Sequence, residues 1–389
     1  MHHSVRNRLL VVTYILTLLY ALHYGIPLYA TSSYLHEYFN SSFISGLYMF
    51  ASICALIAST FIAKQIKRYH TYGLTFGLTI AEIIVITMFA FTHNIYLLVF
   101  FFIVHYIVQT LLYVCLNVFI ESFSKHAETG SIRGLFLALF NIGILISPLI
   151  GGTILENSSF EILYVVSALM LIPFMFFLHK YLSQIEEPAY HSISMLKAFK
   201  PAWRNKNLRA AMIAQFMVSC FYAVMIIYSP IYISTLGISL TTYLSFILPF
   251  SLVPLVVLPY EIGFLADTKF GEKELMITGL VILSVTTFLC VITTSTNPLV
   301  WIAILGTSRI GASFVETMAF TYYFKKIGPE DASLTAIFSN MIGVSTIVVG
   351  AIGVAVSPFI VERPQIMFVI LGCAILFSIY YVLPMRDTR

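Results

Sequence analysis

Apolar runs about twenty residues long recur from one end of the sequence to the other. That is the length an α-helix needs to cross a hydrocarbon layer roughly 30 Å thick. Apolar residues fill 59% of the 389 positions and charged residues only 10%, which is too little charge to cover a soluble protein of this size. The sequence therefore predicts an all-α integral membrane protein without a sizeable soluble domain.

The runs predict twelve transmembrane helices in two groups of six. We expect them at residues 9–31, 43–63, 72–91, 95–120, 134–154, 160–178, 208–235, 243–262, 275–294, 298–321, 333–357 and 364–384. The longest connection separates the two groups. The predicted domains are an N-terminal six-helix bundle at 1–178, a cytoplasmic linker at 179–207 and a C-terminal six-helix bundle at 208–389.

Positive charge lies almost entirely on one side of this map. With an even number of spans, the two termini share a side with the connections 64–71, 121–133, 179–207, 263–274 and 322–332. Nineteen of the 21 Lys and Arg residues lie in these parts or directly beside them, leaving Arg309 inside a span and Arg363 on the opposite side. Because cytoplasmic loops carry such an excess, both termini are predicted to be cytoplasmic, in a plasma membrane or a bacterial inner membrane.

The sequence lacks the residue patterns that metal binding and several kinds of enzyme catalysis require. The five cysteines lie in apolar runs, with no CxxC pair and no histidine at metal-ligand spacing, so we expect neither a metal nor another cofactor. There is no HExxH, GxSxG or nucleotide-binding loop, which argues against an enzyme. The basic stretch at 195–209 fits a solvated linker or a segment lying on lipid headgroups equally well, and it does not support a nucleic-acid partner.

The two halves contain a weak internal repeat. The segment Ile26-Pro27-Leu28-Tyr29 matches Ser229-Pro230-Ile231-Tyr232, with an offset of 203 residues between Pro27 and Pro230. Asn141 and Asn340 match at an offset of 199. The sequence therefore predicts two pseudo-symmetric bundles, and transporters commonly bind their substrate where such repeats meet.

A polar segment follows the second span of the second half: Gly263-Phe-Leu-Ala-Asp267-Thr-Lys269-Phe-Gly271-Glu-Lys273. Its glycines permit a tight turn, and an acid among bases at a membrane face can form a charge lock. A generic polar turn is the alternative. The favoured hypothesis is a cytoplasmic gate made of Gly263, Asp267, Lys269, Gly271 and Lys273.

This segment resembles the loop motif of the major facilitator superfamily, G-x-L-A-D-R-x-G-R-K, and the twelve-span pattern extends the resemblance over nearly the whole chain. One extra residue separates Asp267 from Gly271. In the first half, Lys64 stands at the acid position and Lys67 at the second glycine position. The resemblance therefore implies a gate in the second half.

Span five is similar to the antiporter motif of drug–proton exporters within this family. The similarity rests on Gly143, Ser147, Pro148, Gly151 and Gly152, with the serine replacing a glycine. The motif favours export. Ordinary close packing of small residues in a membrane helix is the alternative.

Three ionisable residues lie deep inside predicted spans, where charge is costly and usually functional. Arg309 lies midway along span ten, and Glu316 follows on the same helix face. We predict that Glu316 exchanges protons, tuned by Arg309; a structural ion pair is the alternative. Glu82 in span three is a second candidate for proton coupling, and a structural hydrogen bond is as good an interpretation for it.

Polar and aromatic residues recur on the spans that line the cavity in the superfamily, namely one, four, seven and ten. In span four they follow i+4 steps, which predicts a polar stripe rather than a lipid-facing surface. The predicted substrate cavity comprises Tyr20, His23, Tyr24, His105, Gln109, Gln215, Tyr222, Arg309 and Ser313.

The sequence as a whole predicts a secondary active transporter that moves a small solute across the bilayer by alternating access. The favoured version is proton-coupled efflux of amphipathic compounds by a monomer. The alternatives are an uptake permease for a polar metabolite (a sugar, nucleoside, amino acid or organic anion) and a non-transporting receptor on the same fold.

Overall fold

The computed structural model describes residues 3–123, 129–183, 195–326, 338, 340–360 and 363–387. Every element in these ranges is helical, which confirms the predicted all-α class. Ten helices there are long and apolar enough to span a membrane: Asn7–His36, Ser41–Thr60, Lys64–Phe91, Ile95–Ile120, Leu135–Asn157, Phe160–Leu182, Lys206–Ile227, Leu240–Ala266, Glu272–Ile292 and Pro298–Tyr323. Two shorter apolar helices follow, Met341–Ala355 and Ile366–Val382, so the number twelve stays a prediction.

The chain divides into two compact units. The first comprises Met1–Tyr34 with Phe50–Ser192, and the second comprises Leu35–Met49 with Ile193–Arg389. Two helices, α2 (Thr31–His36) and α3 (Ser41–Thr60), therefore carry residues of both units. The predicted domain borders at 178 and 208 place all of these residues in the first half.

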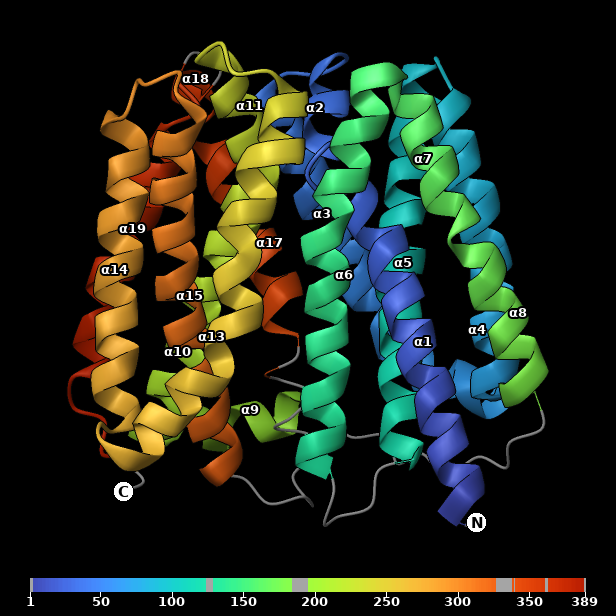
Figure 1. The fold of residues 1–389 in the computed structure, drawn as a ribbon, viewed down its shortest axis with the longest axis horizontal. Helices are drawn as coiled ribbons and strands as arrows, with labels where there is room; N and C mark the ends of the chain where they lie inside the picture. Colours follow the sequence, from blue (N-terminus) through green and yellow to red (C-terminus); the bar gives the residue numbers. More distant parts are fainter. Residues whose placement is uncertain are drawn as a thin grey trace. The chain divides into compact units, whose positions relative to one another are not determined.

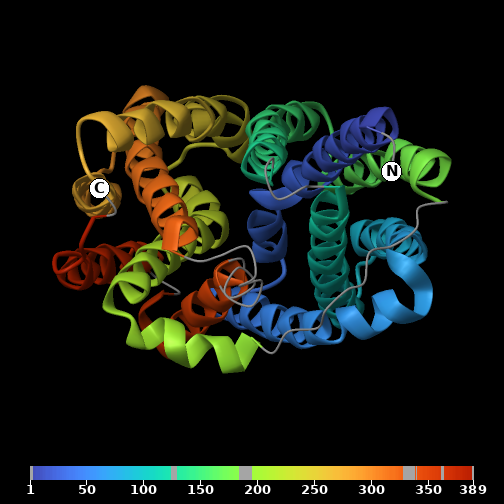
Figure 2. The ribbon, with the colours of Figure 1, turned by 90° about the horizontal axis from the view of Figure 1, so that it is seen from below.

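Six helices build most of the first unit: α1 (His3–Leu28), α4 (Ile62–Phe91), α5 (Ile95–Phe123), α6 (Thr129–Asn157), α7 (Phe160–Leu169) and α8 (Leu171–Leu182). Figure 1 shows α7 continuing into α8 along one rod beside the other helices of this unit, and Figure 2 shows the same helices from below. Helix α5 packs against α1, α4 and α6. Helix α4 is kinked at His70, whose φ of 61° is uncommon for a residue with a side chain, so its straight part begins close to the predicted start of span three.

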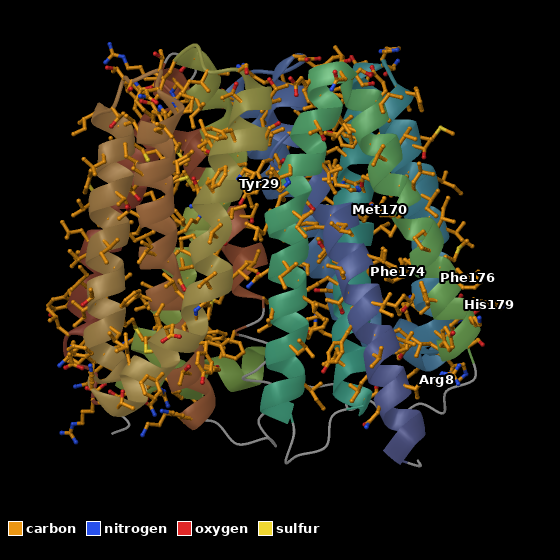
Figure 3. All side chains as sticks on the ribbon, viewed as in Figure 1. Arg8, Tyr29, Met170, Phe174, Phe176 and His179 are labelled. Carbon is orange, nitrogen blue, oxygen red and sulfur yellow. The ribbon has the colours of Figure 1, made fainter. Side chains whose placement is uncertain are left out.

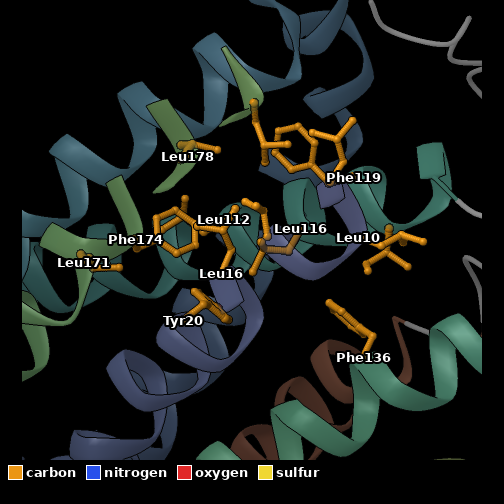
Figure 4. Packing of buried hydrophobic residues seen from close by; sticks show 14 of the residues in the cluster. Leu10, Leu16, Tyr20, Leu112, Leu116, Phe119, Phe136, Leu171, Phe174 and Leu178 are labelled. Atoms are coloured by element: carbon orange, nitrogen blue, oxygen red, sulfur yellow. The ribbon is translucent and has the colours of Figure 1, made fainter. Parts of the chain in front are cut away.

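An apolar core joins α1, α5, α6 and α8 within the first unit. Leu16, Leu112 and Leu116 are enclosed there with Phe136 and Phe174 (Figure 4). The outward faces are also apolar, as expected for a protein whose surroundings are lipid chains. On α8, Phe174 is fully buried whereas Phe176, two residues later, is 57% exposed and lies at the outer edge of the unit (Figure 3).

Small residues bring α1 and α6 into close contact. A Cβ placed on Gly143 would lie 2.5 Å from Cβ of Ala21, and one placed on Gly151 would lie 2.9 Å from the main-chain oxygen of Ile26. Ser147, the serine of the antiporter-like motif, donates its hydroxyl hydrogen back to the Gly143 oxygen at 2.7 Å. Close helix packing therefore accounts for these positions without reference to the direction of transport.

The second unit contains α9 (Met195–Arg204), α10 (Lys206–Ile227), α11 (Ser229–Thr235), α12 (Leu240–Thr242), η1 (Tyr243–Ile247), α13 (Leu248–Thr268), α14 (Glu272–Ile292), α15 (Pro298–Lys326), α17 (Met341–Ala355), α18 (Ser357–Ile360) and α19 (Ile366–Val382). Helix α15 packs against α10, α13 and α14, which explains why residues in its middle are fully enclosed. Pro230 is the second residue of α11, which follows a break at Tyr228, whereas its repeat partner Pro27 lies in the last turn of α1.

Replacing Gly143 by Leu should separate α1 from α6 and lower the free energy of unfolding by about 1–3 kcal/mol, the usual cost of overpacking. Thermal unfolding of the purified protein in detergent measures the effect. The matched control is Gly77→Ala in α4, where an added Cβ meets no atom within 4 Å. Equal midpoints for Gly143→Leu and the unaltered protein would contradict the packing described here.

Candidate substrate and proton sites

Glu82 of α4 lies at the centre of a buried polar cluster in the first unit. Its Oε1 is 3.1 Å from Nε2 of His23 on α1 and 2.5 Å from Nδ1 of His105 on α5. The side chains of His23 and Glu82 are fully buried, and His105 is 4% exposed. The second carboxylate oxygen, Oε2, has no hydrogen-bond partner among the described residues. The structure thus joins two predicted cavity residues to one predicted proton-coupling residue.

Helix α7 fixes the orientation of the His23 ring. Its Nδ1 lies 3.0 Å from the main-chain oxygen of Ser167 and 2.9 Å from the Ser167 hydroxyl oxygen. That hydroxyl donates its hydrogen to the main-chain oxygen of His23 at 2.7 Å. Sequence reasoning missed Ser167, because nothing in the order of residues shows which serine of span six faces span one.

Aromatic side chains lie one turn from this cluster. The Tyr20 hydroxyl donates to the main-chain oxygen of Gln109 at 2.7 Å, which ties α1 to α5. The ring of Tyr20 lies 6.2 Å from those of Tyr24 and Tyr113 and 6.4 Å from that of Phe140, measured between centroids. Three helices of the first unit therefore share an aromatic surface that includes the predicted cavity residues Tyr20 and Tyr24.

Arg309 of α15 is the most unusual buried group in the second unit. Its side chain is fully buried, and its guanidinium carbon lies 4.7 Å from the centre of the Phe221 ring on α10. Its Nη1 makes one long hydrogen bond, 3.5 Å, to Ser308, whereas Nε and Nη2 have no partner among the described residues. Within the described ranges Arg309 forms no ion pair, so the predicted pairing with a carboxylate is not found there.

Further buried polar atoms on α10 and α15 share this condition. Gln215 and Ser219 on α10 and Ser313 on α15 each bury an oxygen without a hydrogen-bond partner in the described structure. Residues 215, 219 and 222 follow i, i+4, i+7 spacing, and so do 309, 313 and 316, so each helix presents a polar strip on one face, about 10 Å long. The strips meet where the Tyr222 hydroxyl donates to Oε2 of Glu316 at 2.7 Å.

Buried polar atoms are normally paired, and each exception asks for an explanation. The Nε and Nη2 atoms form one edge of the guanidinium plane, and this edge binds two in-plane acceptors at once. The strip around Arg309 is therefore suited to a polar ligand that brings its own acceptors and donors.

The predicted gate segment contacts the C-terminal end of the chain. Oδ1 of Asp387 accepts the main-chain N–H of Lys273 at 2.8 Å, and the same carboxylate presses against Gly271, leaving no room for a Cβ there. A Cβ placed on Gly263 would meet no atom within 4 Å in the described structure, and Lys269 is exposed at the end of α13. The side chain of Asp267 lies outside the described residues.

Hydrogen bonds gather four segments at this end of the second unit. The Arg386 main-chain N–H donates to Asn207 at 3.2 Å, and the Tyr322 hydroxyl donates to the Arg386 oxygen at 2.8 Å. Lys325 pairs with Glu272 at 2.8 Å. The C-terminal end thus lies beside the starts of α10 and α14 and the end of α15, as the predicted sidedness requires within this unit.

The two remaining positions of the antiporter-like motif lie in the middle of α6. Pro148 is inside the helix and removes one main-chain donor, and Gly152 is buried. Neither carries a side chain that could bind or exchange a proton.

These features define a polytopic helical membrane protein with buried ionisable groups in both units, which is the construction of a solute carrier. The chain belongs to the Major Facilitator Superfamily, whose family model matches residues 13–351. It is a transporter and not an enzyme.

Solved structures with a similar fold include the nucleoside transporter NupG and a variant of it. The variant has a TM-score of 0.77 at 14% sequence identity, covering 97% of this chain and 100% of that one. NupG itself has a TM-score of 0.76 at 14% identity, with 97% and 98% covered. At this identity the similarity shows the fold alone. No curated protein sequence matches the chain significantly.

The environment of Asp387 predicts that the stability of the protein depends on pH. Burial raises the pKa of its carboxyl above the usual value, and the carboxylates of Glu274 and Glu272 add to the rise. A raised pKa means that the folded chain binds this proton more tightly than the unfolded chain, so the stabilising contribution is present at low pH and is lost as pH rises through the pKa. Asp387→Asn keeps the oxygen that caps α14 and should raise the unfolding midpoint at neutral pH.

The rise in the unfolding midpoint caused by Asp387→Asn should shrink as pH falls toward about 4, where an aspartate ordinarily becomes protonated. Thermal unfolding at the two pH values measures it. Asp387→Ala is the control, because it removes the acceptor and should lower stability by about 1 kcal/mol, as for other lost helix caps. A midpoint of Asp387→Asn below that of the unaltered protein at neutral pH would contradict the prediction.

Proposed function

We propose that the chain is an uptake permease for a polar metabolite that presents two hydrogen-bond acceptors in one plane. The observation that carries the proposal is the buried, unpaired Nε–Nη2 edge of Arg309. A buried charge without a partner destabilises the folded protein by roughly several kcal/mol. Because of this cost, such a charge inside a membrane span usually has a function. A ligand that pairs with this edge removes the penalty, so binding energy is concentrated at one residue.

Two ligand classes share the required chemistry. A carboxylate offers two oxygens to the guanidinium edge, and a guanine base offers an oxygen and a ring nitrogen in the same way. The fold similarity to NupG makes nucleosides the first compounds to test. The unpaired oxygens of Gln215, Ser219 and Ser313 suit hydroxyl and amino groups such as those of a ribose or a base.

Efflux of amphipathic compounds is the second candidate, and the antiporter-like motif of α6 is what favours it. The contacts of Gly143 and Gly151 with α1 supply a packing reason for that motif. Uptake of a polar metabolite therefore takes precedence.

Further parts of the proposal follow the superfamily. The solute would bind near the middle of the membrane, and access would alternate between its two sides. Both termini would be cytoplasmic, consistent with the excess of Lys and Arg and with the contacts of the C-terminal end in the second unit. The transporter would act as a monomer in a plasma membrane or a bacterial inner membrane.

The direct test is uptake of radiolabelled compounds by proteoliposomes containing the purified protein. The panel comprises purine and pyrimidine nucleosides, dicarboxylates, amino acids, sugars and lipophilic dyes. Saturable accumulation of a nucleoside or an organic anion supports the proposal. Transport confined to lipophilic dyes would overturn it in favour of efflux, and the absence of any flux with tight binding would indicate a receptor.

Replacing Arg309 by Met separates a ligand site from a structural role. Met fills a similar apolar volume without charge, so the unliganded protein should unfold at an equal or higher temperature, because an unpaired buried charge has been removed. The substrate found in the panel should no longer stabilise the variant. For the unaltered protein, ligand at about 100 times its Kd adds about 2.7 kcal/mol.

The matched control is Arg209→Met, a cation near the start of α10 outside the polar strip. This substitution should change neither the unfolding temperature of the unliganded protein nor the stabilisation by substrate. A clear loss of stability in unliganded Arg309→Met would show instead that the arginine holds the fold together, and the substrate site would then lie elsewhere.

A further inference from the structure

We propose that His23, Glu82 and His105 form a proton-binding site whose occupancy holds α1 to α4 and couples transport to the proton gradient. The inference rests on the proposed uptake function for its coupling role. The binding of a proton at this site stands on the geometry alone.

Hydrogen-bond roles fix the number of protons in the cluster. The main-chain oxygen of Ser167 can only accept, and the Ser167 hydroxyl has already donated its hydrogen to the His23 oxygen. Both atoms face Nδ1 of His23, so this nitrogen carries a hydrogen. One more hydrogen must lie between Nε2 of His23 and Oε1 of Glu82, and another between Nδ1 of His105 and the same oxygen.

These contacts require three hydrogens. Two neutral histidines and one carboxylate supply only two, with a net charge of −1. The structure therefore corresponds to the cluster with one added proton and no net charge. The proton can lie on His23 beside an ionised Glu82, or on Glu82 beside a neutral His23, and both arrangements keep every contact.

Loss of that proton breaks the arrangement. A lone pair on Nε2 of His23 would then face a negative oxygen, and both side chains are fully buried. The bare Oε2 of Glu82 increases the cost, because it is buried without a donor in the described structure. The proton is thus the bridge between α1 and α4 at this site, and its release removes that bond.

Few other titratable groups face the cluster from the packed helices. Helix α1 adds Tyr20, and α7 adds Tyr164, whose hydroxyl donates to Thr31. Helix α6 has no acid or base between Arg133 and Glu156. On α8 and α4, His179 and Tyr72 pair with each other at 2.7 Å, about 15 Å along α4 from Glu82. The proton is therefore exchanged within the three-residue cluster.

The geometry does not suit a metal. Both histidine nitrogens converge on one carboxylate oxygen rather than around an empty centre. No group of three potential metal ligands with suitable geometry occurs in the described part of the chain.

Thermal unfolding in detergent from about pH 5 to about pH 8, where histidine charge changes, tests proton binding without any substrate. The protonated bridge stabilises the fold, so the midpoint of the unaltered protein should fall as pH rises. Glu82→Gln keeps the shape and makes hydrogen bonds to neutral histidines, so it should reduce this fall by about 2 °C or more. Glu156→Gln replaces an exposed carboxylate of α6 and is the matched control. Its unfolding midpoint should fall with rising pH as much as that of the unaltered protein.

An unaltered midpoint that is flat or rises over this range would overturn the proposal, and so would a Glu82→Gln variant with the same slope as the unaltered protein. If Glu82→Gln does not fold, His105→Gln replaces it with the same expectation. His179→Gln is the control for a histidine outside the cluster.

Transport tests the coupling role. An inward gradient of about one pH unit should drive about tenfold accumulation in the unaltered protein if one proton accompanies each substrate. Glu82→Gln should lose this accumulation but still exchange internal for external substrate. Accumulation by Glu82→Gln equal to that of the unaltered protein would overturn the coupling role. An absence of transport by the unaltered protein would instead be a failure of the proposed function, and the unfolding result would still decide whether the cluster binds a proton.

Discussion

Hydrocarbon cannot form hydrogen bonds, so each polar atom inside a spanning segment must find its partner within the protein or in a ligand. Most polar side chains here meet this constraint locally. Thr13, Thr17, Thr75 and Thr79 each donate to the carbonyl one turn earlier in their own helix. Two ionisable groups depart from this local pattern: Glu82 bonds to histidines of two other helices, and two guanidinium nitrogens of Arg309 have no partner among the described residues.

The two units meet the constraint in different ways. In the first, Glu82 obtains both of its partners from other helices, and the arrangement is complete only with an added proton. In the second, the Nε–Nη2 edge of Arg309 has no acceptor among the described residues. We propose that one unit holds a proton and that the other binds a polar solute. A symporter needs both kinds of site, and the two lie on residues far apart in the chain.

Sequence patterns were sufficient for the helical class, for most of the spans and for the ionisable residues worth attention. Charge inside an apolar run is visible without coordinates, so Glu82, Arg309 and Glu316 could all be singled out. Their partners could not, because the rotation of one helix against another decides them. Arg309 and Glu316 share a helix face, yet Glu316 is bonded to Tyr222 of another helix. Asp387 likewise lies far along the chain from the α14 end that it caps.

Motif similarity was less informative than charge. Gly143 and Gly151 of the antiporter-like motif pack against α1, and direction of transport does not follow from packing. The gate-like segment is joined to the C-terminal end through Asp387, a contact that a sequence motif defined on one loop does not contain. Whether either segment controls access stays a prediction.

Proton movement during transport tests the central claim most directly. The chosen substrate is added to lightly buffered cells that produce the protein, and the external pH is followed with an electrode against cells that lack it. Uptake together with a proton predicts that the medium becomes more alkaline when substrate is added. Acidification would show exchange against protons, and an unchanged pH during measurable uptake would show that no proton is carried; either result would contradict the account.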